Sequence, residues 1–139
     1  MPPIHYSRDE RLDAEELIDV LRRSTLGERR PIDDADCIEQ MVRHADLTVT
    51  ARDGEGRLVG VARSVTDFAY CCYLSDLAVD RDAQRQGIGV ELIRRTREAL
   101  GPRCNLILLS APAAVGYYPR IGFESHPACF LIGRDAPLG

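Results

Sequence analysis

Gln84-Arg85-Gln86-Gly87-Ile88-Gly89 comes directly after the apolar run 74–79 and opens an amphipathic helix. Glycines leave the backbone bare where a loop turns into a helix, so several N–H groups can point at one anion, and the helix dipole favours negative charge there. Gln84 and Arg85 add side-chain donors, and bonds from a guanidinium to a phosphate are among the stronger polar contacts. The stretch therefore predicts a diphosphate site and a phosphorylated carrier as ligand.

Two other interpretations of the same stretch stay open. Gly87 and Gly89 can instead allow a helix to pack closely against a sheet, and Arg85 can be a solvated surface charge together with Arg81. A dinucleotide-binding Gly-x-Gly-x-x-Gly fits poorly, because Leu92 stands where its last glycine would be. Nicotinamide chemistry is therefore disfavoured.

The composition is that of a small globular protein with one domain over residues 1–139. The chain is 45% apolar and 29% charged, with a net charge of −4. Arginines are scattered among acidic residues, so no uniform basic face is available for nucleic acid. No apolar run approaches the roughly 20 residues of a membrane span, and residues 1–5 lack the features of a secretory signal. We expect a cytoplasmic protein that binds neither nucleic acid nor membranes.

The cysteines and histidines do not suggest a catalytic thiol or a metal site. The five cysteines are odd in number, contain no Cys-x-x-Cys, and mostly lie in apolar runs, as buried free thiols do. The three histidines lie outside those runs, so none is placed to activate a cysteine as a catalytic nucleophile. No cluster of His, Cys or carboxylate residues has the spacing of metal ligands, and we expect no metal site.

Capping and periodicity signals in the first half predict two helices and a hairpin. A short strand near 4–6 precedes a helix that Asp13 caps, with Glu16 three residues on, and that lasts until 24 or 25. After a break at 27–31, Asp33 or Asp34 caps a second helix. Strands at 47–51 and 58–65 flank a turn at 53–56.

The second half continues the alternation of strands and helices. A strand over 70–79 leads to the helix from Gly87, which ends at 101–102. A buried strand at 105–110, a short helix from Pro112 and a final strand at 128–132 complete the chain. The predicted order is β-α-α-β-β-β-α-β-α-β, a mixed α/β sheet.

The diphosphate stretch resembles the signature of the GNAT superfamily of acetyl-CoA-dependent N-acetyltransferases, Gln/Arg-x-x-Gly-x-Gly/Ala after a strand. A second block at 117–123, Tyr-Tyr-Pro-Arg-Ile-Gly-Phe, resembles the family's aromatic-Tyr-x-x-x-Gly-Phe segment at the expected distance. The order of elements matches the GNAT architecture, and the resemblance covers roughly residues 4 to 133. It implies direct transfer of acetyl from acetyl-CoA to a primary amine of a small molecule or peptide.

The resemblance also implies a cofactor site in the V between two splayed central strands. The pantetheine arm would pair with the backbone of Leu77, Ala78 and Val79, and an amide near Leu77 would hold the thioester oxygen as it becomes an oxyanion. Ala111 stands where many members have a cofactor-binding Asn, so Ser110 is expected to replace that contact. The diphosphate would bind at Gln84, Arg85, Gln86, Gly87, Ile88, Gly89 and Val90.

Tyr118 matches the family's tyrosine that protonates, or hydrogen-bonds, the departing CoA sulfur, and Pro119 should shorten the last helix. The base is less defined, because Tyr73 stands where several GNAT branches have a Glu. Asp76 is the nearest carboxylate, although in a regular strand it points to the face opposite Tyr73. Asp76 is therefore either the base or a structural partner, and a water chain or an amine of lower pKa would make a protein base unnecessary.

The missing Glu motivates an alternative function. A non-catalytic module that binds acyl-CoA or a protein partner could use the same fold. The acidic composition mildly favours a cationic acceptor. Dimerisation is common in the family, so a homodimer is compatible with the resemblance.

Overall fold

The computed structural model describes residues 3–8 and 10–139. Within these ranges the chain forms two compact units. The N-terminal unit extends to Leu109, and the C-terminal unit comprises Ser110–Gly139. No helix in the described ranges is long and apolar enough to cross a membrane.

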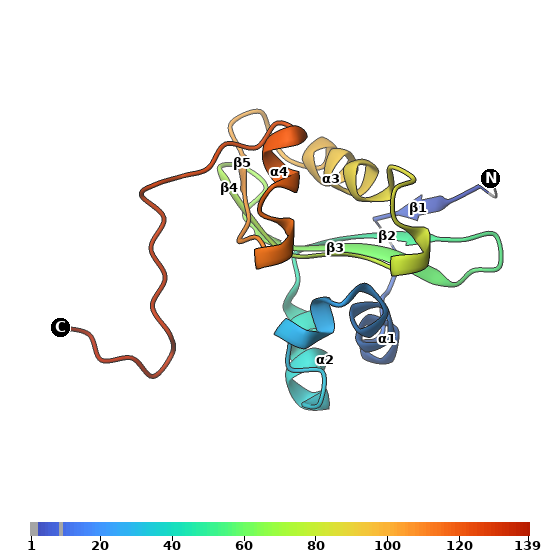
Figure 1. Cartoon of the computed structure of the whole chain (residues 1–139), viewed down its shortest axis with the longest axis horizontal. Coiled ribbons are helices and arrows are strands. Elements are labelled where there is room, and N and C mark those ends of the chain that lie inside the picture. The colour runs from blue at the N-terminus through green and yellow to red at the C-terminus, as the bar shows by residue number, and fades with distance from the viewer. Residues whose placement is uncertain (1–2, 9) are drawn as a thin grey trace. The chain divides into compact units, whose positions relative to one another are not determined.

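The N-terminal unit contains a five-stranded mixed sheet with the strand order β1-β2-β3-β4-β5 (Figure 1). The pairs β1–β2, β2–β3 and β3–β4 are antiparallel, and β5 is parallel to β4. This arrangement confirms the predicted mixed α/β sheet. The strands are β1 His5–Ser7, β2 Leu47–Arg52, β3 Leu58–Thr66, β4 Cys71–Val79 and β5 Asn105–Ile107.

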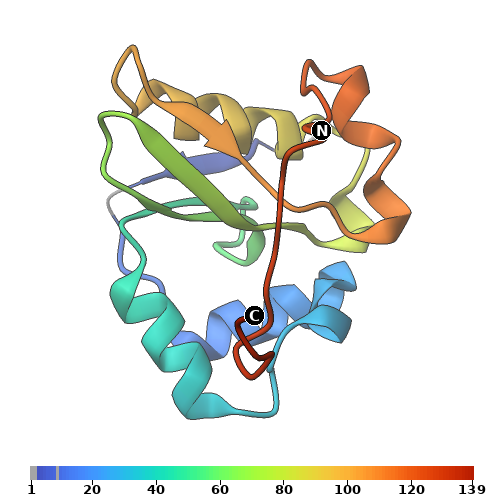
Figure 2. The same cartoon turned by 90° about the vertical axis from the view of Figure 1, so that its left-hand side faces the viewer.

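Helices cover both faces of this sheet. α1 (Ala14–Ser24) and α2 (Ala35–His44) lie on one face, and α3 (Ile88–Glu98) lies on the other (Figures 1 and 2). The predicted caps are present: the carboxylate of Asp13 accepts a hydrogen bond from the Glu16 N–H at 2.8 Å, and that of Asp34 accepts one from the Cys37 N–H at 3.1 Å. The break between the two helices contains a short 3₁₀ helix, η1 (Leu26–Arg29).

The core on the α1 and α2 side is an apolar cluster contributed by both helices and the sheet. Burial of such side chains supplies most of the free energy that holds the helices on the sheet. On the other face, Gly60 of β3 lets α3 approach closely, because an added Cβ there would lie 3.1 Å from atoms of both Ile88 and Leu92. The cluster comprises Leu12, Leu17, Val20, Leu21, Ile38, Leu58, Val61 and Ala78.

The strand predicted at 105–110 is shorter and more exposed than expected. β5 pairs with three residues of β4 and ends at Ile107, whose side chain is 53% exposed. The prediction of a buried strand was wrong because, within the described ranges, β5 is an edge strand with a neighbour on one side alone. A continuous apolar run cannot by itself distinguish an edge strand from a central one.

The C-terminal unit contains two short helical segments, η3 (Pro112–Ala114) and α4 (Tyr117–Arg120). The short α4 agrees with the expected effect of Pro119, which lacks a helical N–H. The final strand predicted at 128–132 does not form, and Phe130 and Leu131 are 90% and 75% exposed. β-propensity reflects packing against a neighbouring strand, and no strand in the described ranges pairs with this segment.

Candidate functional site

β4 and the edge strand β5 part after three paired residues, which leaves the rest of that edge of β4 without a strand neighbour among the described residues. The parallel ladder between β4 and β5 ends, in the described ranges, at the pair formed by Tyr73 and Ile107. β4 continues to Val79 and stays paired with β3 along that length. The stretch of β4 beyond Tyr73 therefore has a free edge on the β5 side, as the predicted splay requires.

The hydrogen-bond pattern at the end of β4 determines which main-chain groups face this open edge. The N–H of Asp80 donates to the carbonyl of Val59 on β3 at 2.8 Å. Successive residues of a strand alternate in the direction of their N–H and C=O groups, so Val79 and Leu77 face away from β3. The N–H and C=O of Leu77 therefore point to the open edge, whereas those of Ala78 are directed to β3.

Gln84 connects the open edge to the loop that follows it. Its side-chain Nε2 donates to the carbonyl of Val79 at 3.1 Å. This bond occupies a main-chain acceptor at the end of β4 and orients the start of the loop. The expected contact of Gln84 with the cofactor stays a prediction beside this bond.

The loop between β4 and α3 presents bare backbone to solvent. Residues 84–87 are exposed, and the backbone of Arg85 and Gly87 adopts positive φ angles of 66° and 79°. A Cβ added to Gly87 would meet no atom within 4 Å. Open space at this position supports the anion-binding interpretation of Gly87, and the close helix-to-sheet packing that was the alternative is provided by Gly60.

The N-terminus of α3 differs from those of α1 and α2. Both of those helices have an Asp side chain that bonds a first-turn amide, whereas α3 begins at Gly87 with no side-chain cap. Its first intrahelical bond runs from the Glu91 N–H to the Gly87 carbonyl at 3.0 Å. The earlier amides, including those of Ile88, Gly89 and Val90, have no intrahelical acceptor and can bind an anion.

A buried ion pair just before the loop was not predicted from the sequence. The guanidinium of Arg23 on α1 bonds the carboxylate of Asp80 and also donates to the Leu58 carbonyl at 2.7 Å. Burial works against ionisation of Asp80, but the Asp82 amide and Arg23 together lower its pKa below the ordinary value. This network attaches the entrance of the loop to α1 and β3.

Asp76 is fully buried, and both of its oxygens are engaged. Oδ1 accepts from Arg30 Nε at 2.6 Å and Oδ2 accepts from Arg63 Nε at 2.5 Å. A carboxylate held by two guanidinium groups and shielded from water is poorly placed to remove a proton from a substrate. The geometry favours the structural role for Asp76, which was one of its two interpretations.

The expectation that Asp76 and Tyr73 point to opposite faces of β4 needs correction. The pairing shifts register between Arg63 and Ser64, so that Arg63 is opposite Asp76 while Val65 is opposite Tyr73. Arg63 and Val65 lie on the same face of β3 because they are two residues apart. Asp76 and Tyr73 therefore share a face, since the bulge interrupts the alternation that a regular strand would have.

Tyr118 and Ser110 belong to the C-terminal unit. The Tyr118 ring makes edge-to-face contacts with Tyr117 and Phe123, at centroid distances of 5.2 and 5.4 Å. Burial, and to a smaller extent Tyr117, raises the pKa of Tyr118, which keeps its hydroxyl protonated at neutral pH. The Ser110 hydroxyl donates to the Ala111 carbonyl at 2.7 Å. The roles of both residues toward a cofactor stay predictions.

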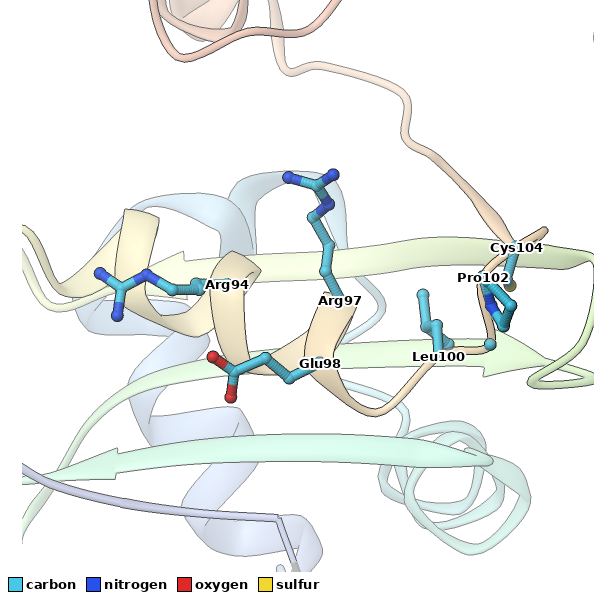
Figure 3. A pocket seen from close by; sticks show the side chains of 7 residues that line it. Arg94, Arg97, Glu98, Leu100, Pro102 and Cys104 are labelled. Atoms are coloured by element: carbon cyan, nitrogen blue, oxygen red, sulfur yellow. The ribbon is translucent and has the colours of Figure 1, made fainter.

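A separate surface pocket of about 380 Å³ lies at the C-terminal end of α3, far along the helix from Gly87. Figure 3 shows that Arg97 points away from the direction taken by Arg94 and Glu98, while Leu100, Pro102 and Cys104 lie beyond the helix end. The charged groups do not converge on one ligand. The pocket is therefore a weaker candidate than the open edge and its loop.

The family model described as "Acetyltransferase (GNAT) domain" matches residues 27–130. The chain belongs to the GNAT acetyltransferase family. The matched range includes the open edge of β4, the bare loop and the Tyr118 block, so the sequence resemblance is confirmed.

Known GNAT proteins resemble this chain over different lengths. GCN5-related N-acetyltransferase 1, chloroplastic, from Arabidopsis thaliana is 29% identical over 91% of this chain and 71% of its own length. GCN5-related N-acetyltransferase 2, chloroplastic, from the same plant is 35% identical over 52% of this chain, and the match spans 29% of that protein. A GNAT family N-acetyltransferase (YhbS) from Escherichia coli, solved in complex with CoA, shares the fold with a TM-score of 0.69 and 22% identity, over 89% of this chain and 70% of that one.

Proposed function

We propose that this GNAT acetyltransferase moves acetyl from acetyl-CoA directly to a primary amine of a small molecule or peptide. The observation that carries the proposal is the continuity of the open edge of β4 with the bare loop and uncapped N-terminus of α3. A linear ligand with a diphosphate and an amide-containing arm fits this surface: the arm can pair with the main chain of the open edge, and the diphosphate can bind the free amides at the start of α3. The CoA bound to the related Escherichia coli protein supports this choice of ligand.

Three parts of acetyl-CoA, the diphosphate, the pantetheine arm and the thioester, have matching groups on the chain. The diphosphate accepts hydrogen bonds from the free amides of Gly87 to Val90, with the α3 dipole favouring its charge. The pantetheine amides pair with the main chain of Leu77 and with the N–H of Val79, whose carbonyl already accepts from Gln84. The Leu77 N–H then faces the thioester oxygen and stabilises the negative charge that develops there, a contribution of about 3 kcal/mol for one such donor.

The transfer step requires little further from the protein. The amine attacks the thioester carbon, the carbon–sulfur bond breaks, and Tyr118 donates a hydrogen bond or proton to the leaving sulfur. An ordinary alkylamine of pKa about 10.4 loses its proton at a cost of nearly 5 kcal/mol at pH 7. Because both Asp76 oxygens are engaged by arginines, we assign removal of the amine proton to water, a step that costs less when the acceptor amine is less basic.

The alternative is a module that binds acyl-CoA without catalysis. It is favoured by the lack of a free carboxylate at the expected place on β4: Tyr73 stands where several GNAT branches have Glu, and both oxygens of Asp76 on the same strand are engaged. Location in the cytoplasm and formation of a homodimer stay predictions.

The proposal is tested by incubating the protein with acetyl-CoA and a panel of primary amines, while free thiol and the mass of each amine are followed. The proposed function predicts amine-dependent thiol release and an acetylated product. Tight binding of acetyl-CoA without product on any amine would favour the non-catalytic module. Absence of both binding and product would contradict both candidates.

A further inference from the structure

Three charged residues form a buried clamp on β4, at the position where the strand is irregular. Asp76 lies at the centre, with 0% of its side chain exposed, and Arg30 and Arg63 bond its two oxygens. Arg63 comes from the neighbouring strand β3, whereas Arg30 follows η1, 46 residues before Asp76 in the chain. We refer to Arg30, Arg63 and Asp76 as the arginine clamp.

The clamp also bonds Ser75, the residue that precedes Asp76. Arg30 Nη2 donates to the Ser75 carbonyl at 2.7 Å, and Arg63 Nη2 donates to the Ser75 hydroxyl at 3.1 Å. Ser75 is the extra residue of the bulge, because Arg63 pairs with Asp76 and Ser64 pairs with Leu74. A bulge disrupts the ladder locally, so the groups that bond it decide how the strand continues.

Leu77 immediately follows the clamped segment. The Ser75 carbonyl and the Leu77 N–H belong to two successive planar peptide units that are joined at the Cα of Asp76. Fixing the Ser75 carbonyl and the Asp76 side chain therefore restricts the direction of the Leu77 N–H. A donor of this kind is effective when it is already aimed at the charge that develops in the transition state.

Stability alone is a weak explanation for the clamp. Removing charges from water is costly, and a buried ion pair can often be replaced by apolar groups of similar volume without loss of stability. Arg30 is the most exposed member, at 20%, and connects the segment between η1 and α2 to the open edge of β4. Its bidentate contact with a carboxylate and a main-chain carbonyl specifies geometry as well as energy.

We infer that Arg30 is a positioning residue, which acts through Asp76 and Ser75 to aim the Leu77 amide at the thioester oxygen. The inference rests on the proposed function. It assigns Asp76 to holding the strand, in place of proton abstraction, and predicts that loss of Arg30 slows transfer without weakening cofactor binding.

The test compares Arg30→Gln and Arg30→Lys with the control Arg29→Gln, in the full-length protein. Arg29 is the exposed neighbour, and its contribution to Arg30 is its main-chain carbonyl, which the substitution retains. The readouts are kcat, the acetyl-CoA affinity from calorimetry, and the infrared carbonyl stretch of bound, isotope-labelled acetyl-CoA. The infrared readout needs no acceptor amine.

The inference predicts that Arg30→Gln lowers kcat by roughly tenfold to a hundredfold while the acetyl-CoA affinity changes by less than about threefold. The thioester stretch, shifted to lower frequency in the parent protein, returns toward the value in water. Arg30→Lys, which keeps the charge but not both contacts, shows a smaller change in both readouts and serves if Arg30→Gln fails to fold.

Other outcomes separate the positioning role of Arg30 from the proposed acetyltransferase function. An unshifted stretch in the parent protein, or the same stretch and kcat in parent and variants, overturns the positioning role while leaving the proposed function intact. Failure of the parent protein to bind acetyl-CoA overturns both.

Discussion

The side-chain Nε2 of Gln84 donates to the main-chain carbonyl of Val79 at 3.1 Å, so the residue that follows the 3₁₀ turn Arg81–Ala83 is bonded back to the last residue of β4. A single hydrogen bond of this kind contributes about 1 kcal/mol. We expect Gln84→Ala to weaken acetyl-CoA binding by roughly fivefold with kcat unchanged, because the loop loses its orientation. Calorimetry and steady-state kinetics measure the two effects. Gln40→Ala, an exposed change on α2, is the control, and equal affinities in both variants would contradict this role.

Gly87 and Gly56 form a matched pair for testing the loop. Their φ angles are 79° and 82°, and a Cβ at either position meets no atom within 4 Å. Substitution by Ala therefore adds the same backbone strain, about 1–2 kcal/mol, at both positions. We expect similar losses of thermal stability but a fall in acetyl-CoA affinity for Gly87→Ala alone. Comparable affinities would show that the diphosphate binds elsewhere.

Tyr118→Phe removes the proposed donor to the sulfur while keeping the ring and its contacts with Phe123. We expect kcat to fall within the roughly 10²- to 10⁴-fold range of general acid catalysis, with acetyl-CoA affinity nearly intact. Tyr117→Phe is the control, since the adjacent tyrosine shares the environment but has no assigned role in transfer. A turnover number unaffected by Tyr118→Phe would remove the assignment.

Asp67 should make the turn between β3 and β4 sensitive to acid. Hydrogen bonds from the backbone amides of Tyr70, Cys71 and Ala69 lower the pKa of Asp67 to about 2 from an ordinary value of 3.8. A depressed folded-state pKa stabilises the protein above the unfolded value, and this stabilisation is lost as the pH falls through 3.8 toward 2. The difference in unfolding free energy between the parent and Asp67→Asn should therefore shrink across this window. A difference in unfolding free energy that does not change with pH in this window would contradict the lowered pKa of Asp67.

Features set by neighbouring residues could be predicted from the sequence. Asp13 and Asp34 cap helices through amides three residues away, and the glycine-containing loop before α3 is likewise local. These signals, in order along the chain, were enough to predict the mixed sheet and the candidate cofactor loop.

The clamp could not be predicted, because Arg30 and Asp76 are far apart in sequence and no local pattern relates them. The bulge at Ser75 likewise depends on how β4 meets β3, so the shared face of Tyr73 and Asp76 was missed. The prediction of a final strand at 128–132 was wrong for a related reason. Phe130 to Ile132 have strand-forming side chains, but strand formation also requires a partner edge.

The most direct test of the account follows individual backbone amides by NMR as acetyl-CoA is added to the ¹⁵N-labelled protein. The account predicts that the N–H signals of Ile88, Gly89 and Leu77 shift together and saturate at one affinity, because the diphosphate and the thioester bind as parts of one ligand. Signals at the C-terminal end of α3, around Leu100 and Cys104, should stay in place. Saturating shifts confined to that end, or none at Gly89 and Leu77, would contradict the account.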